Sequence, residues 1–488
     1  MTPAARRMEK GIFGHPRGLM TLFFTEMWER FSYYGMRALL ILFMVAPATN
    51  GGLGFDTPKA ARIYGWYTAL VYMLAIPGGF AADRFLGLKN AVLVGGIIIA
   101  LGHFSMAIPS ITTFFLGLGL IVIGTGLLKP NVSSLVGALY EENDRRRDAG
   151  FSIFYMGINL GAFLAPLVTG YLGQKINWHY GFVAAGVGMT FGLIQYVLGR
   201  GNLRDPVVSR DSTPARGSNW INPKFLGLAA VYVGSLIAAN YVLKPLGALG
   251  ELLYILWLYM PPVWIIAKSM SEGAKETERK RIWAIVVLFI FSALFWAAFE
   301  QAGSSLNLFA DRFTRTTLLN WNFPSSWFQS VNSIFIILLA AGFAWFWLKL
   351  GTHEPSIPSK FAYGLLFVGL GFLAVAIAAI FSGPDKSKVS PMWLILVYLC
   401  HTIGELCLSP VGLSAVTKLA PARHAGLAMG VWFLSLSMGN KIGGWVAGFF
   451  ESFPLPKLFG TVFLTTACAA LLLAFVVKPI KNLMSGVH

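Results

Sequence analysis

Long apolar runs recur along the chain from Leu19 to Val477 and are separated by short polar segments. About 20 apolar residues are enough for a helix to cross a bilayer, and these runs reach that length. The pattern therefore predicts an all-α polytopic membrane protein. We expect fourteen transmembrane helices, at residues 19–47, 57–81, 90–109, 112–139, 149–172, 179–199, 223–243, 249–269, 281–309, 326–349, 360–382, 390–416, 424–450 and 455–477.

Two polar stretches divide the series of helices. Residues 200–222 and 271–281 are charged or rich in Pro and Ser, and they bracket two of the predicted helices. Six helices come before that pair and six follow it. This predicts an N-terminal bundle, a linker with an inserted helix pair, and a C-terminal bundle, at residues 1–200, 201–280 and 281–488. A binding site is expected between the two bundles near the middle of the membrane, while the role of the inserted pair, beyond a packing brace, stays open.

The distribution of charge predicts the orientation. The chain is 56% hydrophobic and only 12% charged, with a formal net charge of +17. One set of alternate loops, which includes both termini, carries almost three times as many Lys and Arg as the other set. Cytoplasmic loops carry the excess of basic residues, so both termini are expected in the cytoplasm and nucleic-acid binding is disfavoured. The three cysteines lie in apolar spans and imply no disulfide framework.

The first predicted span carries four charges, Glu26, Glu29, Arg30 and Arg37. Each charge at mid-membrane depth costs about 2.5–3.5 kcal/mol on insertion scales, so the group requires a reason. At 3.6 residues per turn, Glu26, Arg30, Tyr33 and Arg37 share one face of the helix. That face must line a watery cavity or pair with charges on other helices.

Single polar residues interrupt other spans. Lys129 lies too far from the end of its helix to reach water easily, which favours a functional role over snorkelling. Tyr155 and Asn159 are one turn apart, and Asn159 either binds a ligand or joins two helices. In the span at 281–309, Trp296, Glu300, Ser304 and Asn307 are predicted to form one stripe. The lone Glu300 is either a proton carrier or half of a structural ion pair.

Further polar residues lie in the last third of the chain. His401, Glu405 and Ser409 follow one another at intervals of four, and Cys400 and Cys407 lie nearby. A metal site from these groups is disfavoured because their spacing matches no known ligand pattern. No cofactor is expected.

The charges differ in sign between the two predicted bundles. The first contains Arg30, Arg37 and Lys129 beside its acids, whereas the second contributes Glu300 and Glu405. A cavity between them would be dipolar, and it would suit a zwitterion whose carboxylate meets Arg or Lys and whose ammonium meets Glu.

Several segments together resemble one family. The stretch from Glu26 to Gly35, EMWERFSYYG, resembles the ExxER motif of proton-dependent oligopeptide transporters in the major facilitator superfamily. Residues 151–159, 124–133 (GTGLLKPNVS), 299–301 (FEQ) and 404–414 (GELCLSPVGLS) are similar to the same family. Residues 78–89 resemble the superfamily's signature loop, in which Asp83 is expected to cap a helix end and pair with basic neighbours. The resemblance runs the full length, and the inserted pair resembles bacterial members.

This resemblance implies a proton-coupled symporter that imports di- and tripeptides by alternating access, with protons as the coupling ion. It implies a monomer in the bacterial inner membrane and no enzymatic activity. The residues implied in proton coupling are Glu26, Glu29, Arg30 and Glu300. Those implied in substrate binding are Arg30, Tyr33, Tyr34, Tyr72, Lys129, Tyr155, Asn159, Asn332, Glu405, Ser409 and Trp432, although Trp432 fits a packing role equally well. The implied gates are the pairs Arg37–Glu300 and Lys129–Glu405.

One departure and several alternatives remain. Animal members and some bacterial ones carry a histidine early in the second helix, where this chain has Tyr67 to Tyr72. Proton coupling would then depend on Glu26, Glu29 and Glu300. A carrier of amino acids, nitrate or drugs on the same fold is the nearest alternative, although Glu405 argues against nitrate. An intramembrane enzyme lacks a nucleophile elbow, a zinc-protease motif or a phosphate loop. Flux against a gradient would exclude a channel or receptor.

Overall fold

A computed structural model describes residues 11, 14–141, 144, 146–203, 223–383, 387–421 and 424–486. Two polar regions lie outside this part of the chain: the N-terminal stretch with Arg6, Arg7 and Lys10, and most of the 200–222 linker. The elements up to the linker are α2 (Arg17–Val45), η2 (Ala48–Asn50), α3 (Thr57–Met73), α4 (Ala75–Ala81), η3 (Ala82–Leu86), α5 (Leu88–Met106), α6 (Ile111–Ala138), α7 (Arg146–Tyr171), η4 (Leu172–Ile176), α8 (Trp178–Gly199) and η5 (Arg200–Asn202).

The inserted pair consists of α9 (Pro223–Leu243) and α10 (Gly247–Ser271), joined by η7 (Lys244–Leu246). The remaining elements are α11 (Glu276–Phe299), η8 (Glu300–Gly303), α12 (Ser305–Phe313), β1 (Thr317–Leu318), β2 (Trp321–Asn322), η9 (Ser325–Phe328), α13 (Gln329–Leu350), η10 (Gly351–His353), α14 (Ile357–Ile380), α15 (Met392–Leu419), α16 (Ala425–Ala447), α17 (Leu455–Phe475) and α18 (Val477–Met484). The two strands pair antiparallel in a short hairpin.

Helices occupy all fourteen predicted spans, which confirms their number, although not every span is one continuous helix. By length and composition, eleven helical stretches of the described chain could each cross a membrane. One of the eleven, Ala230–Ser271, contains parts of both α9 and α10, and α2 and α16 lie outside the set. The four charges of α2 keep it out, and in α16 the glycines together with Asn440 and Lys441 lower the mean hydropathy. These are the two helices in which polar residues are most needed for another purpose.

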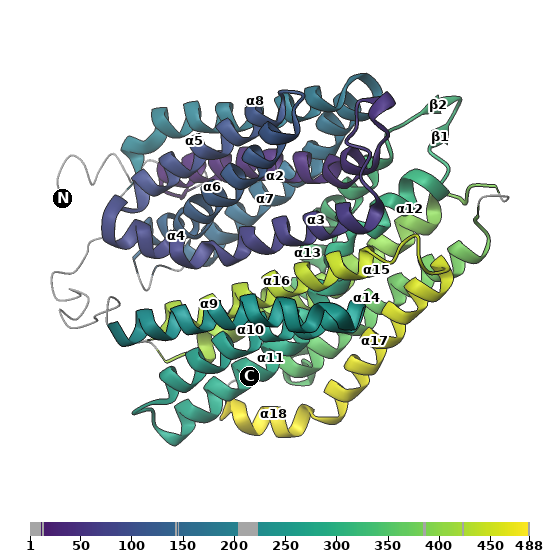
Figure 1. Cartoon of the computed structure of the whole chain (residues 1–488). Helices are drawn as coiled ribbons and strands as arrows, with labels where there is room; N and C mark the ends of the chain where they lie inside the picture. Colours follow the sequence, from purple (N-terminus) through teal and green to yellow (C-terminus); the bar gives the residue numbers. More distant parts are fainter. Residues whose placement is uncertain are drawn as a thin grey trace.

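The helices pack as two groups with a hairpin at the side (Figure 1). In the first group α5 packs on α6 and α8, and α2 packs on α7 and α8. In the second group α14 packs on α15 and α17, and α11 packs on α16. The groups meet along two seams, α3 against α16 and α7 against α13, while α10 packs on α11 and α16. The division at residues 200 and 280 remains our proposal for the domain boundaries.

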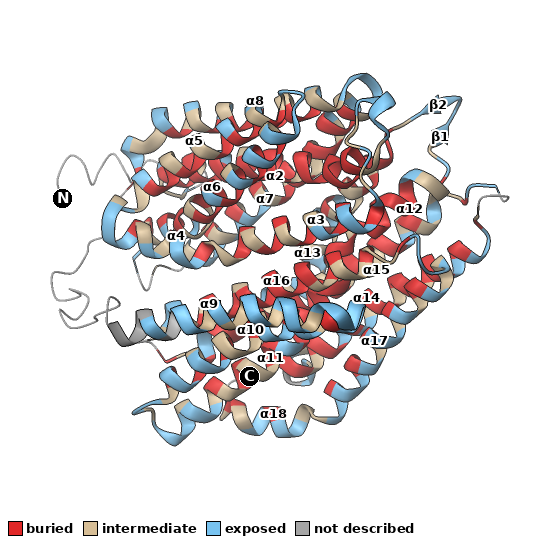
Figure 2. Ribbon diagram, in the orientation of Figure 1, coloured by how far each residue is buried: buried red, intermediate tan, exposed pale blue. Residues whose placement is uncertain are grey.

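Helix α2 lies at the centre of the first group. Figure 2 shows it buried along most of its length, including Glu26, Glu29, Arg30 and Arg37, each of which is at most 4% exposed. By contrast, α9 exposes an apolar surface that includes Val231 and Tyr241. A lipid-facing helix can be apolar all round, whereas a central helix can hold charge if other helices shield it.

The prediction of one continuous helix at 281–309 is wrong. Helix α11 ends at Phe299, a 3₁₀ turn follows, and α12 begins at Ser305. The stripe of Trp296, Glu300, Ser304 and Asn307 is therefore broken, because Ser304 leaves the helical conformation at φ −125°, ψ −96°. Gly303 is followed by two serines, and Gly and Ser pairs are among the recognised sites of sharp helix kinks.

The predicted loop at 78–89 is also more helical than expected. Helix α4 runs to Ala81, and a π-helical turn continues to Leu86, so the break is confined to Gly87 with φ 73°. Asp83 was expected to cap a helix end, but Gly87 precedes α5 and no side chain caps that helix. The reason is that Asp83 lies inside the π turn, away from the N-cap position of α5, and it lines a cavity instead.

A glycine contact tests the packing of α2 on α7. A Cβ at Gly161 would lie 2.2 Å from the main-chain oxygen of Met27, whereas a Cβ at Gly119 would meet no atom within 4 Å. We predict that Gly161→Ala lowers the free energy of unfolding by about 1–3 kcal/mol, as overpacking does. The matched control Gly119→Ala should be neutral or slightly stabilising. Thermal unfolding in detergent measures both, and equal melting temperatures would contradict this packing.

Candidate functional site

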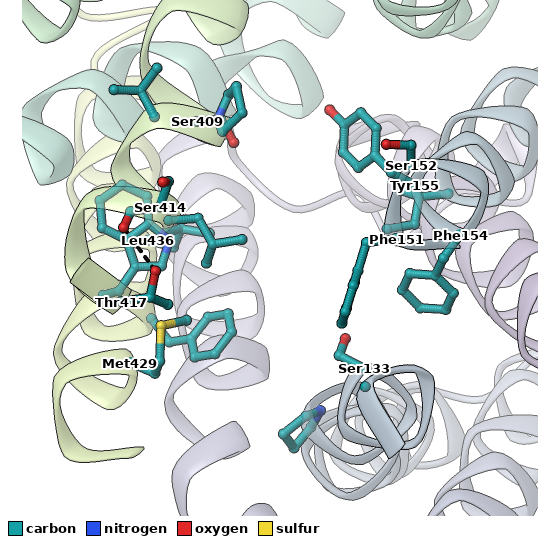
Figure 3. Close-up of a pocket in the computed structure, with 18 of the residues that line it drawn as sticks. Ser133, Phe151, Ser152, Phe154, Tyr155, Ser409, Ser414, Thr417, Met429 and Leu436 are labelled. Carbon is teal, nitrogen blue, oxygen red and sulfur yellow. Dashed lines mark hydrogen bonds between the residues drawn. The ribbon is translucent and has the colours of Figure 1, made fainter. Parts of the chain in front are cut away.

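A cavity of about 2770 Å³ separates the two groups of helices at one end of the molecule. Figure 3 shows its two walls, with Phe151, Ser152 and Tyr155 of α7 on one side and Ser409 and Ser414 of α15 on the other. Its lining extends from Glu26 and Lys129 to charged residues near helix ends, such as Arg84 of η3 and Lys418 in the last turn of α15. We call this end of the molecule the open end.

A smaller cavity of about 210 Å³ adjoins the first one and shares Glu26, Lys129, Tyr155, Asn159 and Ser409 with it. It is lined by side chains from both groups of helices. Its further polar residues are Arg30, Tyr34, Arg37, Tyr72, Glu300, Gln329, Asn332, Ser333, Tyr398, His401 and Glu405. Ionisable groups from five α-helices and from the turn η8 thus surround the small cavity.

Arg30 is buried and pairs with two acidic residues of its own helix, Glu26 and Glu29. Its Nε lies 3.3 Å from Glu26 Oε1, and its Nη2 donates to Glu29 Oε1 at 2.7 Å. A second short contact joins its Nε to Glu29 Oε2. Glu29 lies behind Arg30 and lines neither cavity, whereas Glu26 and Arg30 line the small one. The three side chains carry a net charge of −1 when all are ionised, which one proton on a carboxyl would neutralise.

Lys129 reaches the same space from α6. Its Nζ lies 4.0 Å from the centre of the Tyr72 ring, a cation–π arrangement. Tyr34 lines the small cavity between two cations, since Arg30 and Arg37 lie 5.9 and 5.6 Å from the centre of its ring. The positive wall of the site therefore consists of Arg30 and Lys129 against tyrosine faces.

The opposite wall carries Glu405 of α15. Its Oε2 accepts a hydrogen bond from Asn332 Nδ2 of α13 at 3.2 Å, and the same nitrogen contacts Thr402 Oγ1 at 3.0 Å. Ser409, one turn from Glu405, lines both cavities. This side of the site offers a carboxylate held in place by an amide.

Asn159 and Trp432 each had two interpretations in the sequence. Asn159 Nδ2 donates to the Tyr155 main-chain oxygen at 3.0 Å within its own helix, and its side chain lines both cavities. No bond from it to another helix occurs in the described part of the chain, which favours the ligand-facing interpretation. Trp432 does both, since it packs edge-on against Phe361 and also lines the large cavity.

An ion pair lies at the far limit of the small cavity. Arg37 Nη2 of α2 is 3.0 Å from Glu300 Oε2, and both side chains are 5% exposed. Arg37 Nε also donates to Tyr64 Oη of α3 at 2.8 Å. After the break at Phe299, Glu300 and Gly303 lie against this guanidinium: a Cβ at Gly303 would lie 2.8 Å from Arg37 Nε and 2.0 Å from Tyr64 Oη. The pair joins the first group of helices to the second.

Hydrogen bonds also join the groups beyond this ion pair. Asn307 Nδ2 donates to the Ala38 main-chain oxygen at 2.8 Å, and Gln174 Oε1 accepts from the Ser326 hydroxyl at 2.7 Å. Along the same seam, Ser330 Oγ donates to the Phe163 oxygen at 2.8 Å. Thr57 Oγ1 donates to Glu451 Oε1 at 2.6 Å. This end of the molecule, which we call the closed end, is sealed while the other is open.

The structure differs from two of the expectations, those for Tyr33 and for the pair of Lys129 and Glu405. Tyr33 was expected to shape a side-chain pocket, but it lines neither cavity and packs against Tyr34 and Tyr67 instead. It lies on the buried side of α2, since the helix turns Arg30 and Tyr34 toward the space. The expected pair of Lys129 and Glu405 is not formed in this open-ended conformation, where each has a partner of its own helix group. It stays a prediction for the opposite conformation.

Some site residues were missed by sequence reasoning. Tyr64, Gln174 and Tyr398 contact or line the site, but tyrosine and glutamine near span ends are common and gave no signal. As for metals, the described residues contain no group of three or more His, Cys, Asp or Glu arranged to hold an ion.

Comparisons with known proteins place the chain in a family. The model of the POT family matches residues 89–462. The chain belongs to the POT family. An uncharacterized transporter of Bacillus subtilis is 45% identical, with 98% of this chain and 97% of that protein covered. A di-/tripeptide transporter of Lactococcus lactis is 37% identical over 99% of each chain. A crystal structure of a POT family transporter in complex with a thioalcohol-conjugated peptide is 35% identical, with a TM-score of 0.85 over 98% of this chain and all of that one.

Membership of the POT family makes this chain a membrane transporter rather than an enzyme. The same comparisons confirm the resemblance drawn from the sequence motifs and the major facilitator arrangement of fourteen helices.

The Arg37–Glu300 pair allows a test by double substitution. Removing one partner of a buried ion pair leaves an uncompensated charge, at a cost of about 3–5 kcal/mol. We predict that Arg37→Met strongly lowers the melting temperature in detergent and that Arg37→Met with Glu300→Met recovers most of the loss. The exposed pair Glu276–Lys280, at 2.7 Å, is the matched control and should give changes below about 1 kcal/mol. A double variant no more stable than Arg37→Met alone would contradict a direct pairing.

Proposed function

We propose that this POT-family chain is a proton-coupled symporter that imports di- and tripeptides by alternating access. The observation that carries the proposal is the pairing of opposite walls around one space, with Arg30 and Lys129 on the first group of helices and Glu405 on the second. A peptide has one carboxylate and one ammonium, and it would satisfy both walls at once. The similarity to a di-/tripeptide transporter of Lactococcus lactis and to a POT family transporter that binds a thioalcohol-conjugated peptide supports the substrate class.

In this proposal the peptide carboxylate binds Arg30 and Lys129, which can offer several charged hydrogen bonds. The ammonium binds Glu405, with Asn332 and Asn159 completing the polar surroundings. Side chains of the peptide would contact the aromatic residues of the walls, Tyr34, Tyr72, Tyr155 and Trp432, near Ser409. Tyr33 does not contact the peptide and only supports Tyr34 and Arg30 by packing against them.

The proton is proposed to act on the closed end. While Glu300 is ionised, it pairs with Arg37 and draws the two groups of helices together. A proton on Glu300 removes that attraction, so the closed end can open. Glu26, next to Arg30 and exposed to the small cavity, is placed to exchange a second proton when a peptide carboxylate competes for Arg30, while Glu29 stays paired. Because both ligands bias the same two-state change, their coupling is reciprocal.

The basic segments predicted to be cytoplasmic lie at the open end, so the structure would be inward-facing. Arg84, Arg147 and Lys418 all line the mouth of the large cavity. With that orientation both termini lie in the cytoplasm and the membrane is the bacterial inner membrane. The chain would act as a monomer, since the site is made from its own two groups of helices.

Other small substrates on the same fold are the second candidate. Nitrate would leave Glu405 facing an anion, which disfavours it. A single amino acid has both charges but is shorter than a dipeptide, and drugs vary in charge. A thermal-shift screen of amino acids, dipeptides and tripeptides separates these, because stabilisation grows with ligand concentration relative to the dissociation constant.

The carboxylate clamp is tested by binding. We predict that Arg30→Ala and Lys129→Ala each weaken dialanine affinity at least about tenfold, because a charged hydrogen bond contributes about 1.5–3 kcal/mol. Lys280→Ala, which removes an exposed lysine far from the cavities, is the control and should leave affinity unchanged. Isothermal titration on detergent-purified protein measures all three. Unchanged affinity in both site variants would show that the carboxylate binds elsewhere.

The role of Glu300 is tested by transport. Glutamine cannot release a proton, so Glu300→Gln should reduce gradient-driven dipeptide uptake into proteoliposomes by at least about tenfold, the effect of 1.4 kcal/mol. Exchange of labelled for unlabelled dipeptide without a gradient should persist in this variant. The exposed Glu276→Gln is the control. Gradient-driven uptake at the wild-type level in Glu300→Gln would contradict the proposed coupling.

A further inference from the structure

Lys441 is a buried cation that the proposed transport site does not use. It lies in α16 toward the closed end, with its side chain only 1% exposed. Its Nζ donates to Glu251 Oε1 at 3.1 Å, and Glu251 belongs to the inserted helix α10. Its Nζ also lies 4.7 Å from the centre of the Trp66 ring on α3. The lysine therefore contacts three parts of the chain: the second group of helices, the first group and the inserted hairpin.

Lys441 is buried where α3 and α16 touch, whereas the Glu251 side chain is 28% exposed. A Cβ on Gly444 would lie 2.4 Å from the Cα of Gly65, and a Cβ on Gly65 would lie 2.9 Å from the Cα of Gly444. Only glycine at both positions permits this approach of the two backbones. The α3–α16 seam belongs to the two different groups of helices, so opening the closed end requires it to separate.

Helix α10 supports the same seam at a second position along α16, at Ser437. Ser437 Oγ of α16 donates to the Ala69 main-chain oxygen of α3 at 2.7 Å. Tyr259 Oη of α10 lies 2.7 Å from the same Ser437 oxygen. Because Ser437 has a single hydroxyl proton and uses it toward Ala69, Tyr259 must be the donor in the second bond. The inserted helix thus holds the serine that joins α16 to α3.

Glu251 also faces the first group of helices. Arg62 Nε of α3 lies 3.9 Å from Glu251 Oε1, although Arg62 is 62% exposed and this contact is weak. Figure 1 shows α10 lying alongside α16. At both positions, α10 contacts a residue of α16 that in turn contacts α3.

We propose that the inserted hairpin is part of the closure of this end of the transporter, with Glu251 as a positioning residue. In the closed seam Lys441 is removed from water, and Glu251 supplies the countercharge that this burial requires. When the seam opens, water reaches Lys441 and the countercharge matters less. Glu251 therefore stabilises the closed seam relative to the opened one. The inference depends on the two ends opening in turn, and not on the identity of the substrate or on protons.

The test measures the conformation directly. Spin labels on Asn50, after α2, and Ser452, after α16, are both exposed at the closed end and report its opening by pulsed EPR distances. The background carries serine in place of Cys400, Cys407 and Cys468. We predict that Glu251→Gln raises the ratio of long to short distances at least about tenfold, which corresponds to only 1.4 kcal/mol of the cost of an unpaired buried charge.

A second variant separates this role from general loss of structure. Lys441→Met removes the charge that Glu251 neutralises, so Glu251→Gln combined with Lys441→Met should return the distances to the wild-type ratio. Glu272→Gln, an exposed acid at the other end of α10, should leave them unchanged. Unchanged distances in Glu251→Gln would overturn the proposal. So would a double variant that stays as open as Glu251→Gln alone, because Glu251 would then act through a partner other than Lys441.

Discussion

The structure depends on the cost of removing charge from water inside a membrane. An unpaired ion there is expensive, so every buried cation of this chain must find a carboxylate or an aromatic face. Arg30 has Glu26 and Glu29 on its own helix, whereas Arg37 and Lys441 pair with carboxylates far away in the chain. Those long-range pairs hold together helices that belong to different groups. Charge compensation therefore decides which helices stay together.

The distribution of contacts between the two ends gives the molecule its asymmetry. At the closed end, the groups of helices are joined by the Arg37–Glu300 pair and by single hydrogen bonds such as Asn307 to Ala38. At the open end, the cavity separates them, and Lys129 and Glu405 each have a partner on their own side. Besides these polar contacts, the groups pack on each other along α3–α16 and α7–α13. In the proposed mechanism, neutralising one charge weakens this closed end, so that it opens as alternating access requires.

Much of this was predictable from the sequence. Hydrophobic length predicts the helices, and charges in apolar runs mark Glu26, Arg30, Arg37, Lys129, Glu300 and Glu405 as site residues, because lipid cannot accommodate them. All six of these residues line the small cavity. Periodicity could not predict the break after Phe299. The break depends on the low helix propensity of Gly303 and of the two serines that follow it, and on the contact of Gly303 with Tyr64. Periodicity also placed Tyr33 on the cavity side of α2. It could not show which other helices cover each face of α2, and in the structure Tyr33 packs against Tyr34 and Tyr67.

The partner of Lys441 could not be predicted either. Glu251 is 190 residues away in a hairpin that looked like an independent insertion, and neither residue belongs to a motif. Only the packing of α10 on α16 brings them together. The inserted pair thus shares an electrostatic constraint with the transport helices.

The central claim is that buried charges couple a peptide to protons, and concentrative transport tests it most directly. Wild-type protein in proteoliposomes, with the membrane potential clamped and the outside more acidic, would be given labelled dialanine. The account predicts accumulation inside above the outside concentration, with collapse to equality when a protonophore is added, since the inward proton gradient supplies the free energy. Internal dialanine that never exceeds the outside concentration, or accumulation that survives the protonophore, would contradict it.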